Sequence, residues 1–159
     1  SDIARAAHAS VGSLYQYFPT KESLGKALLV QYTTSFANEL EQWKKTIPTS
    51  ADVFADELVS LTLRMIGEMP AWVVLFASPA LGSYKRDALG VLTGTMAGLL
   101  HAWAPNIPER RTARVAHTMW QLVGGAIHAN TTVDNLEAEM VVDEMRVVLG
   151  SYLKSQLTA

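Results

Sequence analysis

The most informative part of this sequence is residues 2–24, which read DIARAAHASVGSLYQYFPTKESL. Two short helix-forming runs, residues 2–7 and 11–18, flank a three-residue break at positions 8–10. Ser10 ends this break and is of a residue type that caps the N-terminus of a helix. Two short helices joined by so tight a turn are typical of a helix-turn-helix, whose second helix can enter the major groove of DNA.

Helical periodicity continues through the remainder of the chain. Apolar residues recur three or four positions apart in segments that begin near Thr20, Ser50, Gly82, Pro108 and Leu136. Thr20 and Ser50 are expected to be the N-caps of the first two of these helices. Residues 71–78 form a shorter segment that is apolar on all sides, and we expect it to be buried. A strand is the alternative there, but no second strand-like run is present to pair with it. We therefore predict an all-α protein of about eight helices.

Composition narrows the class of protein further. Of the 159 residues, 49% are hydrophobic and 18% are charged, which is typical of a folded globular chain. The net charge of −2 argues against a uniformly basic coat for nucleic acid. The longest apolar run, residues 71–77, is far shorter than the roughly 20 residues of a membrane span. We expect a soluble, cytoplasmic protein with no membrane partner.

The sequence offers little for catalysis or metal binding. It contains no cysteine, which excludes disulfides and cysteine–zinc sites. Its four histidines include no pair four residues apart, and it has no glycine-rich phosphate loop or nucleophile elbow. We therefore expect neither an enzyme nor a metal or cofactor site.

The segment from Asp2 to Leu24 resembles the DNA-binding signature of the TetR (tetracycline-repressor) family of transcriptional regulators. The agreement includes a Gly-Ser-Leu-Tyr string at 12–15, Tyr-Phe at 17–18 and Lys-Glu at 21–22. Three positions depart from the signature: His8 replaces glycine, Ala9 replaces valine and Ser13 replaces threonine. Members of this family have a complete helix before the motif, whereas this sequence begins within the second helix, so we expect the DNA-binding module to be incomplete as it stands.

The resemblance implies a domain organisation and a function. Residues 1–45 would form the DNA-binding domain and its connecting helix, and residues 46–159 a helical domain for ligand binding and dimerisation. The protein would be a homodimer on double-stranded operator DNA, acting as a repressor that a small hydrophobic or aromatic effector releases. The alternatives are a helical protein-interaction module without DNA binding and, least favoured, an all-α enzyme.

Under this interpretation, the DNA-contacting residues follow from their chemistry and their place in the motif. Lys21 can place its ammonium against a phosphate beside a helix N-terminus. Gln16 can make a bidentate contact with adenine, and Gly12 allows the helix to approach the groove closely. The expected set is Arg5, Ser10, Val11, Gly12, Ser13, Tyr15, Gln16, Tyr17 and Lys21.

The second half of the chain contains many aromatic and methionine side chains at helical spacing. An ordinary core is the simpler interpretation of these residues, but the family resemblance favours an apolar ligand pocket between helices. The expected pocket residues are Met65, Met69, Trp72, Phe76, Trp103, His117, Met119 and Trp120.

The last two long helices are the best candidates for a dimer interface. Both are apolar on more than one face, which implies more burial than one chain provides, and two glycines in mid-helix would allow another backbone to approach. Within the last helix, Met140 and Val148 are expected to face inward. The expected interface residues are Leu122, Gly124, Gly125, Met145, Leu149 and Tyr152.

Overall fold

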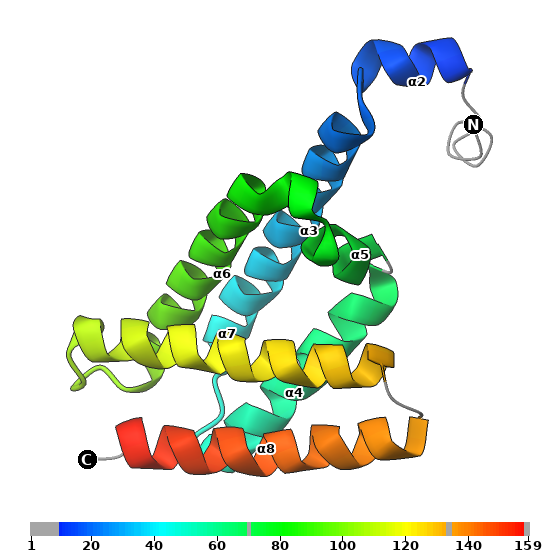
Figure 1. Ribbon diagram of the computed structural model, residues 1–159. Helices are drawn as coiled ribbons and strands as arrows, with labels where there is room; N and C mark the ends of the chain where they lie inside the picture. The colour runs from blue at the N-terminus through cyan, green and yellow to red at the C-terminus, as the bar shows by residue number, and fades with distance from the viewer. Residues whose placement is uncertain (1–9, 70, 133–134, 158–159) are drawn as a thin grey trace.

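The computed structural model describes residues 10–69, 71–132 and 135–157, together with the side chains of all of these except 125–132 and 135–136. The described residues contain helices and no strand, which confirms the all-α prediction (Figure 1). The α-helices are α2 (Val11–Tyr17), α3 (Lys21–Trp43), α4 (Ala51–Glu68), α5 (Ala71–Ala77), α6 (Gly82–Trp103), α7 (Glu109–Thr132) and α8 (Asn135–Leu157). Two short 3-10 helices, η1 (Lys44–Thr46) and η2 (Pro79–Leu81), connect α3 to α4 and α5 to α6.

The long helix α3 begins at a complete capping box. The backbone N–H of Ser23 donates to Thr20 Oγ1 at 3.0 Å, and the backbone N–H of Thr20 donates to Ser23 Oγ at 3.1 Å. These bonds satisfy two donors that the helix itself leaves unpaired, and they confirm Thr20 as the N-cap. Ser50 is the N-cap of α4, as predicted, but its side chain makes no capping hydrogen bond.

The core lies where α3, α4, α6, α7 and α8 meet. The helix pairs α3–α6, α6–α7, α7–α8 and α4–α8 pack along much of their length. Large side chains with almost no exposed surface fill the space between them: Leu29, Leu40, Phe54, Leu58, Leu92, Met96, Leu99, Leu100, Val115, Met119, Leu149 and Leu153.

The helices α4 and α8 approach each other closely at Gly150. A Cβ atom at this position would lie 2.7 Å from Asp52 Oδ1 and 3.4 Å from Asp52 Cα. Two ion pairs join the same helices, one between Lys154 Nζ and Asp52 Oδ2 at 2.6 Å and one between Arg146 and Asp56. Because all four charged groups are partly exposed, these pairs contribute little compared with the apolar contacts beneath them.

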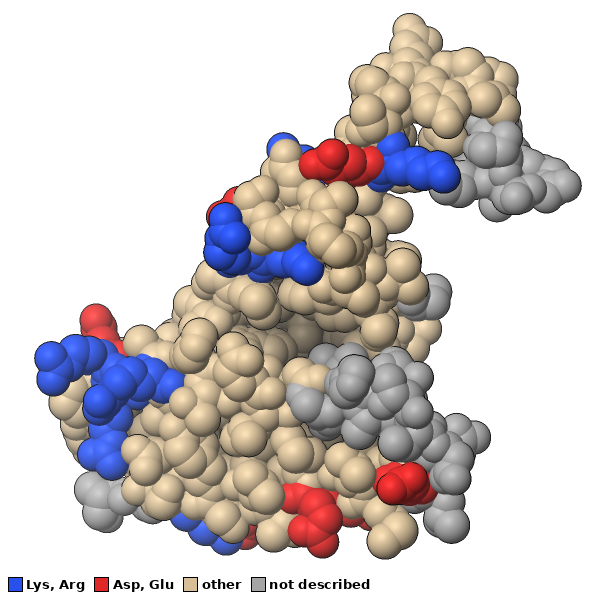
Figure 2. Space-filling view, in the orientation of Figure 1, with Lys and Arg blue, Asp and Glu red and all other residues tan. Residues whose placement is uncertain are grey.

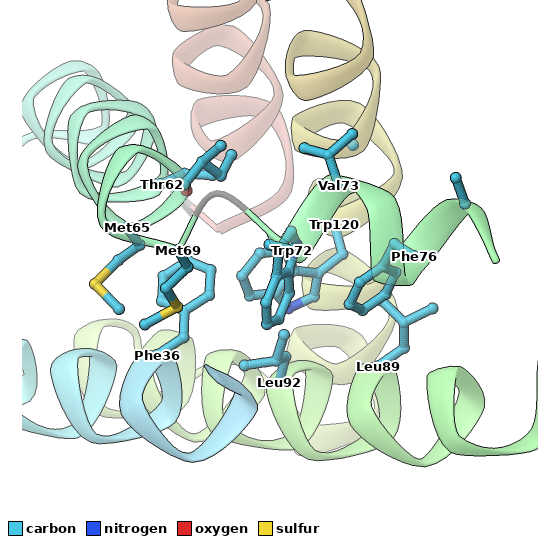
Figure 3. Close-up of a pocket in the computed structure, with 13 residues that line it drawn as sticks. Phe36, Thr62, Met65, Met69, Trp72, Val73, Phe76, Leu89, Leu92 and Trp120 are labelled. Carbon is cyan, nitrogen blue, oxygen red and sulfur yellow. The ribbon is translucent and has the colours of Figure 1, made fainter. Parts of the chain in front are cut away.

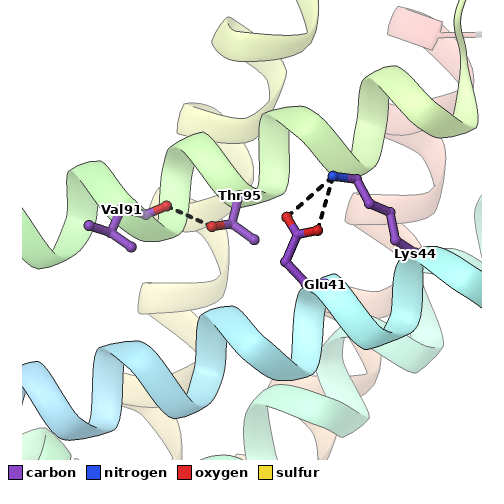
Figure 4. A network of polar contacts seen from close by, with 4 residues as sticks. All are labelled: Glu41, Lys44, Val91 and Thr95. Carbon is purple, nitrogen blue, oxygen red and sulfur yellow. Dashed lines mark hydrogen bonds and ion pairs between the residues drawn. The ribbon is translucent and has the colours of Figure 1, made fainter.

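A lysine that follows α3 lies between the end of that helix and α6. Lys44 Nζ donates to both carboxylate oxygens of Glu41 at 3.2 Å (Figure 4). A Cβ on Gly98 of α6 would lie only 3.3 Å from this ammonium, so the glycine leaves room for the lysine. On α6 itself, Thr95 Oγ1 donates to the Val91 carbonyl at 3.0 Å, which satisfies that hydroxyl within the helix.

Two predictions about burial are wrong. Residues 71–78 are not buried on all sides, since Trp72 is the buried residue of α5 and Val74 is 70% exposed. Met140 and Val148 do not face inward and are 64% and 43% exposed. In each case the helix packs on the core along one face and leaves apolar side chains on its other face. Among the described residues, no single helix is both long and apolar enough to cross a membrane.

Candidate nucleic-acid interface and ligand cavity

The short helix α2 projects from the body of the molecule at the outer end of α3 (Figure 1). Leu14 and Phe18, which are four residues apart, are half-buried on one side of it. Ser13 and Gln16 lie on the opposite side and are exposed, and Tyr17 beside them is 79% exposed. Val11, Gly12 and Tyr15 are exposed as well. The helix therefore presents a polar side of short and medium-length hydrogen-bonding groups.

The N-terminus of α2 is closed by Ser10. Ser10 Oγ accepts a hydrogen bond from the backbone N–H of Ser13 at 2.9 Å, and the two hydroxyls lie 2.9 Å apart. This oxygen is thus engaged in capping. Among the described residues, a Cβ on Gly12 would have one neighbour within 4 Å, Ser10 Oγ at 3.7 Å. Arg5 lies outside the described residues.

The first turn of α3 supplies the charge that α2 lacks. Lys21 and Glu22 are exposed there, and α2 itself has no charged residue. In Figure 2 the described part of the projecting end is accordingly uncharged, and basic and acidic side chains gather at its base. Lys26 lies one turn further along, with its ammonium 4.5 Å from the centre of the Tyr84 ring. That contact joins α3 to α6, whereas the ammonium of Lys21 has no partner among the described residues.

A cavity of about 280 Å³ lies in the body of the molecule (Figure 3). It is bounded by α3, α4, α5, α6 and α7. The described side chains that line it are mostly aromatic, aliphatic or methionine, and none of them is ionisable: they are Phe36, Thr62, Met65, Ile66, Met69, Trp72, Val73, Phe76, Ala77, Leu89, Leu92, Trp120 and Gly124. Such a lining favours an apolar molecule.

Four aromatic rings from three helices stand around this cavity. Phe36 of α3 lies edge-to-face with Trp72 of α5, with ring centres 6.3 Å apart, and with Trp120 of α7, at 5.3 Å. Phe76 stacks on Trp72 one turn along α5 at 4.6 Å. Edge-to-face and offset-stacked pairs are the preferred aromatic geometries, so these rings form stable walls.

The structure brings five of the eight predicted pocket residues together at this cavity and leaves three elsewhere. Those that line it are Met65, Met69, Trp72, Phe76 and Trp120. Trp103 packs instead on Phe54, with ring centres 5.1 Å apart, Met119 is buried in the core, and His117 is exposed. Met119 directly precedes Trp120, and adjacent residues of a helix face different directions.

Sequence reasoning missed eight of the lining residues, which are Phe36, Thr62, Ile66, Val73, Ala77, Leu89, Leu92 and Gly124. The helical spacing of Thr62, Met65 and Met69 places them on one side of α4 and could have indicated Thr62. Phe36 lies on the apolar stripe of α3, which the periodicity of that helix does indicate. Its contact with the cavity depends on how α3 crosses α5 and α7, and a periodicity analysis of single helices does not contain that information.

The wall helix α5 is in direct contact with the start of α3. A Cβ on Gly25 would lie 3.3 Å from Leu75 Cδ2 and 3.3 Å from Leu81 Cδ1, so α3 approaches α5 and η2 closely at this glycine. Lys85 Nζ of α6 donates to the Phe76 carbonyl at 2.9 Å and so fixes the C-terminal end of α5. Movement of α5 would therefore act on α3 at a point only one turn away from Lys21.

A second, polar hollow of about 480 Å³ lies between the end of α3 and α4. There Trp43 Nε1 donates to Glu57 Oε2 at 2.7 Å, and Arg64 donates to Glu39 at 3.0 Å. The hydrogen bond that Arg64 donates to Glu39 raises the pKa of Arg64 above its ordinary value. These lining side chains of the hollow are therefore already hydrogen-bonded to one another. No cluster of acidic, histidine or cysteine side chains suited to a metal ion occurs among the described residues.

The predicted dimer residues lie in several different environments. Leu122, Met145 and Tyr152 are half-buried, Gly124 is exposed and also lines the cavity, and the surroundings of Gly125 are outside the described residues. Leu149 is fully buried within the chain and offers no surface to a partner. The exposed apolar surface of α8 is formed instead by Met140, Val147 and Val148.

Known protein families match both the N-terminal segment and the larger remainder of this chain. Residues 1–28 match the family described as bacterial regulatory proteins, tetR family, and residues 47–153 match the tetracyclin repressor-like C-terminal domain. Two curated relatives, from two strains of Mycobacterium tuberculosis, are each described as an uncharacterized HTH-type transcriptional regulator. Each is 29% identical over 133 residues, which cover 77% of this chain and 63% of the relative. No solved structure matches the chain significantly.

Proposed function

Because the chain belongs to the TetR family of transcriptional regulators, we propose that it binds double-stranded operator DNA through α2 and the start of α3. We propose further that it is a homodimeric repressor, released from DNA when a small apolar molecule enters the cavity. The observation that carries the DNA-binding part is the exposed polar side of α2, which projects from the body and bears Ser13, Gln16 and Tyr17.

The role of α2 follows from its size, exposure and chemistry. The major groove accepts one α-helix, and base edges are read by side chains that donate and accept hydrogen bonds. Gln16 can do both in a bidentate contact, and Gly12 lies four residues before it on the same side of the helix. The half-buried Leu14 and Phe18 lie on the other side of the helix, away from the proposed DNA contacts.

Lys21 is assigned a different task. It occupies the first position of α3, where free backbone N–H groups and the helix dipole favour an anion. A phosphate held there would set the position of α2 along the groove without reading sequence. Lys21 should therefore contribute to affinity for any DNA, whereas Gln16 should contribute to the choice of sequence.

A second copy of the chain would complete the surface of α8. Met140 and Val147 are each more than 60% exposed, which is unfavourable for apolar side chains of a helix in water. Pairing of α7 and α8 with the same helices of a partner would form a four-helix interface about a two-fold axis. Such a dimer would carry two copies of α2, which could reach half-sites roughly 34 Å apart.

The ligand would release the protein from DNA through α5. This helix contributes Trp72 and Phe76 to the cavity wall, and its Leu75 touches α3 at Gly25. A ligand that displaces α5 would therefore change the direction of α3 and with it the separation of the two α2 helices. A coupling of this kind is typically about 1–3 kcal/mol, and DNA must weaken ligand binding by the same factor.

The experiment that tests DNA binding compares Gln16→Ala and Lys21→Ala by fluorescence anisotropy on double-stranded DNA over a range of salt concentrations. Gln16→Ala should cost about 1–3 kcal/mol on the preferred sequence and little on others. Lys21→Ala should weaken binding to all sequences and reduce the salt slope by about 0.9. Gln31→Ala and Lys45→Ala, exposed positions further along α3 and in η1, serve as matched controls. If both test variants bind like their controls, the assignment of α2 and Lys21 to the DNA interface is incorrect.

A further inference from the structure

We propose that the cavity selects an uncharged aromatic molecule with one hydrogen-bond acceptor, and that this acceptor binds the indole N–H of Trp120. This proposal rests on the proposed function only in taking the cavity as the effector site. It adds the charge and the polar pattern of the effector, which neither the family nor the relatives specify.

The exclusion of charged ligands follows from the lining of the cavity. None of its thirteen described lining residues carries an ionisable side chain. An ammonium or carboxylate that entered would lose its hydration and gain no partner of opposite charge. Desolvation of an unpaired ion is among the most unfavourable events in a protein interior. An ionised molecule should therefore be rejected even when its shape fits.

The requirement for one acceptor follows from the polar atoms at the cavity wall. Thr62 Oγ1 already donates to the Leu58 carbonyl at 2.8 Å, so its proton is not available to a ligand. Trp120 Nε1 is buried and has no hydrogen-bond partner, and the residue as a whole is 9% exposed. An indole nitrogen can only donate, so its natural partner is an acceptor oxygen such as that of a ketone, ether or ester.

The position of this nitrogen also predicts how the ligand enters. Figure 3 shows Trp120 among the side chains that surround the cavity, opposite Leu92 and beside Trp72. Because Nε1 has almost no exposed surface, an acceptor can reach it only after a neighbouring lining side chain moves. Pairing this donor would favour such a movement, because an unsatisfied buried donor is more unfavourable than the modest net value of an ordinary hydrogen bond. Ligand binding and movement of the cavity wall are thus one event.

The aromatic character follows from the rings that form the walls. Trp72 and Trp120 both contact the edge or face of Phe36, and Phe76 stacks on Trp72. A flat ring inserted among them can adopt the same edge-to-face and stacked geometries. The flexible thioethers of Met65 and Met69 can adjust to its outline.

Four small probes of similar size test the proposal: acetophenone, ethylbenzene, benzoate and benzylammonium. Binding to the whole protein without DNA is followed by the indole N–H resonances of ¹⁵N-labelled protein. Acetophenone should bind about fivefold more tightly than ethylbenzene, the ratio expected for one net hydrogen bond, and should shift the Trp120 N–H proton downfield. Benzoate and benzylammonium should bind at least roughly a hundredfold more weakly than acetophenone.

Two variants separate the acceptor contact from general packing. Trp120→Phe should abolish the preference of acetophenone over ethylbenzene while both still bind. Trp103→Phe, which removes an indole that packs on Phe54 away from the cavity, should preserve that preference. If Trp120→Phe does not fold, the downfield shift in the unmodified protein remains the deciding measurement.

Each outcome has a definite meaning. Equal binding of benzoate and acetophenone would overturn the exclusion of charge, and an unmoved Trp120 resonance in the acetophenone complex would overturn the acceptor contact. Failure of all four probes to bind would refute the proposal for this cavity. None of these results alters the affinity for DNA, so a failure here is distinguishable from a failure of the proposed DNA binding.

Discussion

The contact of Gly25 with α5 and η2 leads to the sharpest prediction. In Gly25→Ala, the new methyl group would lie 3.3 Å from both Leu75 Cδ2 and Leu81 Cδ1, closer than the roughly 3.5–4.0 Å at which carbon atoms attract each other. Leu81 is only 3% exposed and has little room to retreat. Overpacking of this kind typically costs about 1–3 kcal/mol.

A matched glycine removes the effect of helix propensity from this comparison. Alanine is favoured over glycine by about 1 kcal/mol inside a helix, at Gly25 as elsewhere. Gly94 lies within α6, and a methyl group placed there would have no neighbour within 4 Å among the described residues, so Gly94→Ala should gain this propensity without a clash. The difference between the two variants in free energy of unfolding therefore measures the overpacking alone.

The assay is equilibrium unfolding in urea, with the midpoint and slope determined for both variants and the unmodified protein. Gly94→Ala should raise the free energy of unfolding by up to about 1 kcal/mol, and Gly25→Ala should fall below it by about 1–3 kcal/mol. Equal stabilisation by the two substitutions, within about 0.5 kcal/mol, would show that Gly25 is not a point of close contact. The proposed transmission of α5 movement to α3 would then lose its structural basis.

Two further substitutions test the start of α3 and the surface of α8. Thr20→Ala removes half of the capping box and should lower the free energy of unfolding by about 0.5–2 kcal/mol. The control Thr49→Ala, in an exposed loop, should change this free energy by less than about 0.5 kcal/mol. Equal effects of the two substitutions in denaturant titrations would argue against the capping role of Thr20. Val147→Asp places a charge on the exposed apolar face of α8 and should convert the dimer to a monomer in light-scattering measurements, while Val30→Asp on α3 should leave it dimeric. A Val147→Asp protein that remains a dimer would move the interface away from this face.

The elements that depend on local chemistry could be predicted from the sequence. Thr20 caps α3 because the side chain of a threonine directly before a helix can accept a hydrogen bond from the backbone N–H of the third helical residue. The stripe of Phe36 and Leu40 lies in the core because 3.6-residue periodicity places both on one face. The family resemblance of residues 2–24, confirmed by the match over residues 1–28, likewise depends on order and spacing alone.

The composition of the cavity could be predicted only in part. Met65, Met69 and Trp72 are predictable because large apolar residues cluster near the junction of two helices. Trp103 and Met119 have the same chemistry but pack elsewhere, because the crossing of α4, α6 and α7 decides which apolar face meets the cavity and which meets the core. Crossing angles depend on the packing of whole helices against one another, and no single periodic pattern contains them.

The outer surface of α8 could not be assigned for a related reason. Leu149 and Val148 are neighbours of similar hydrophobicity, yet one is fully buried and the other is 43% exposed. A helix that is apolar on two sides gives no indication of which side its own chain covers. In the structure, the close crossing of α4 and α8 at Gly150 places one of these sides against α4.

The central claim, that the exposed side of α2 enters DNA, is tested most directly by photo-crosslinking. A photoreactive benzoylphenylalanine at Tyr17, which is 79% exposed on α2, should crosslink to bound double-stranded DNA, and the same group at Val30 on α3 should not. The crosslinked nucleotides should lie in the major groove within each half-site. Bound DNA that crosslinks from position 30 but not from position 17 would contradict the account.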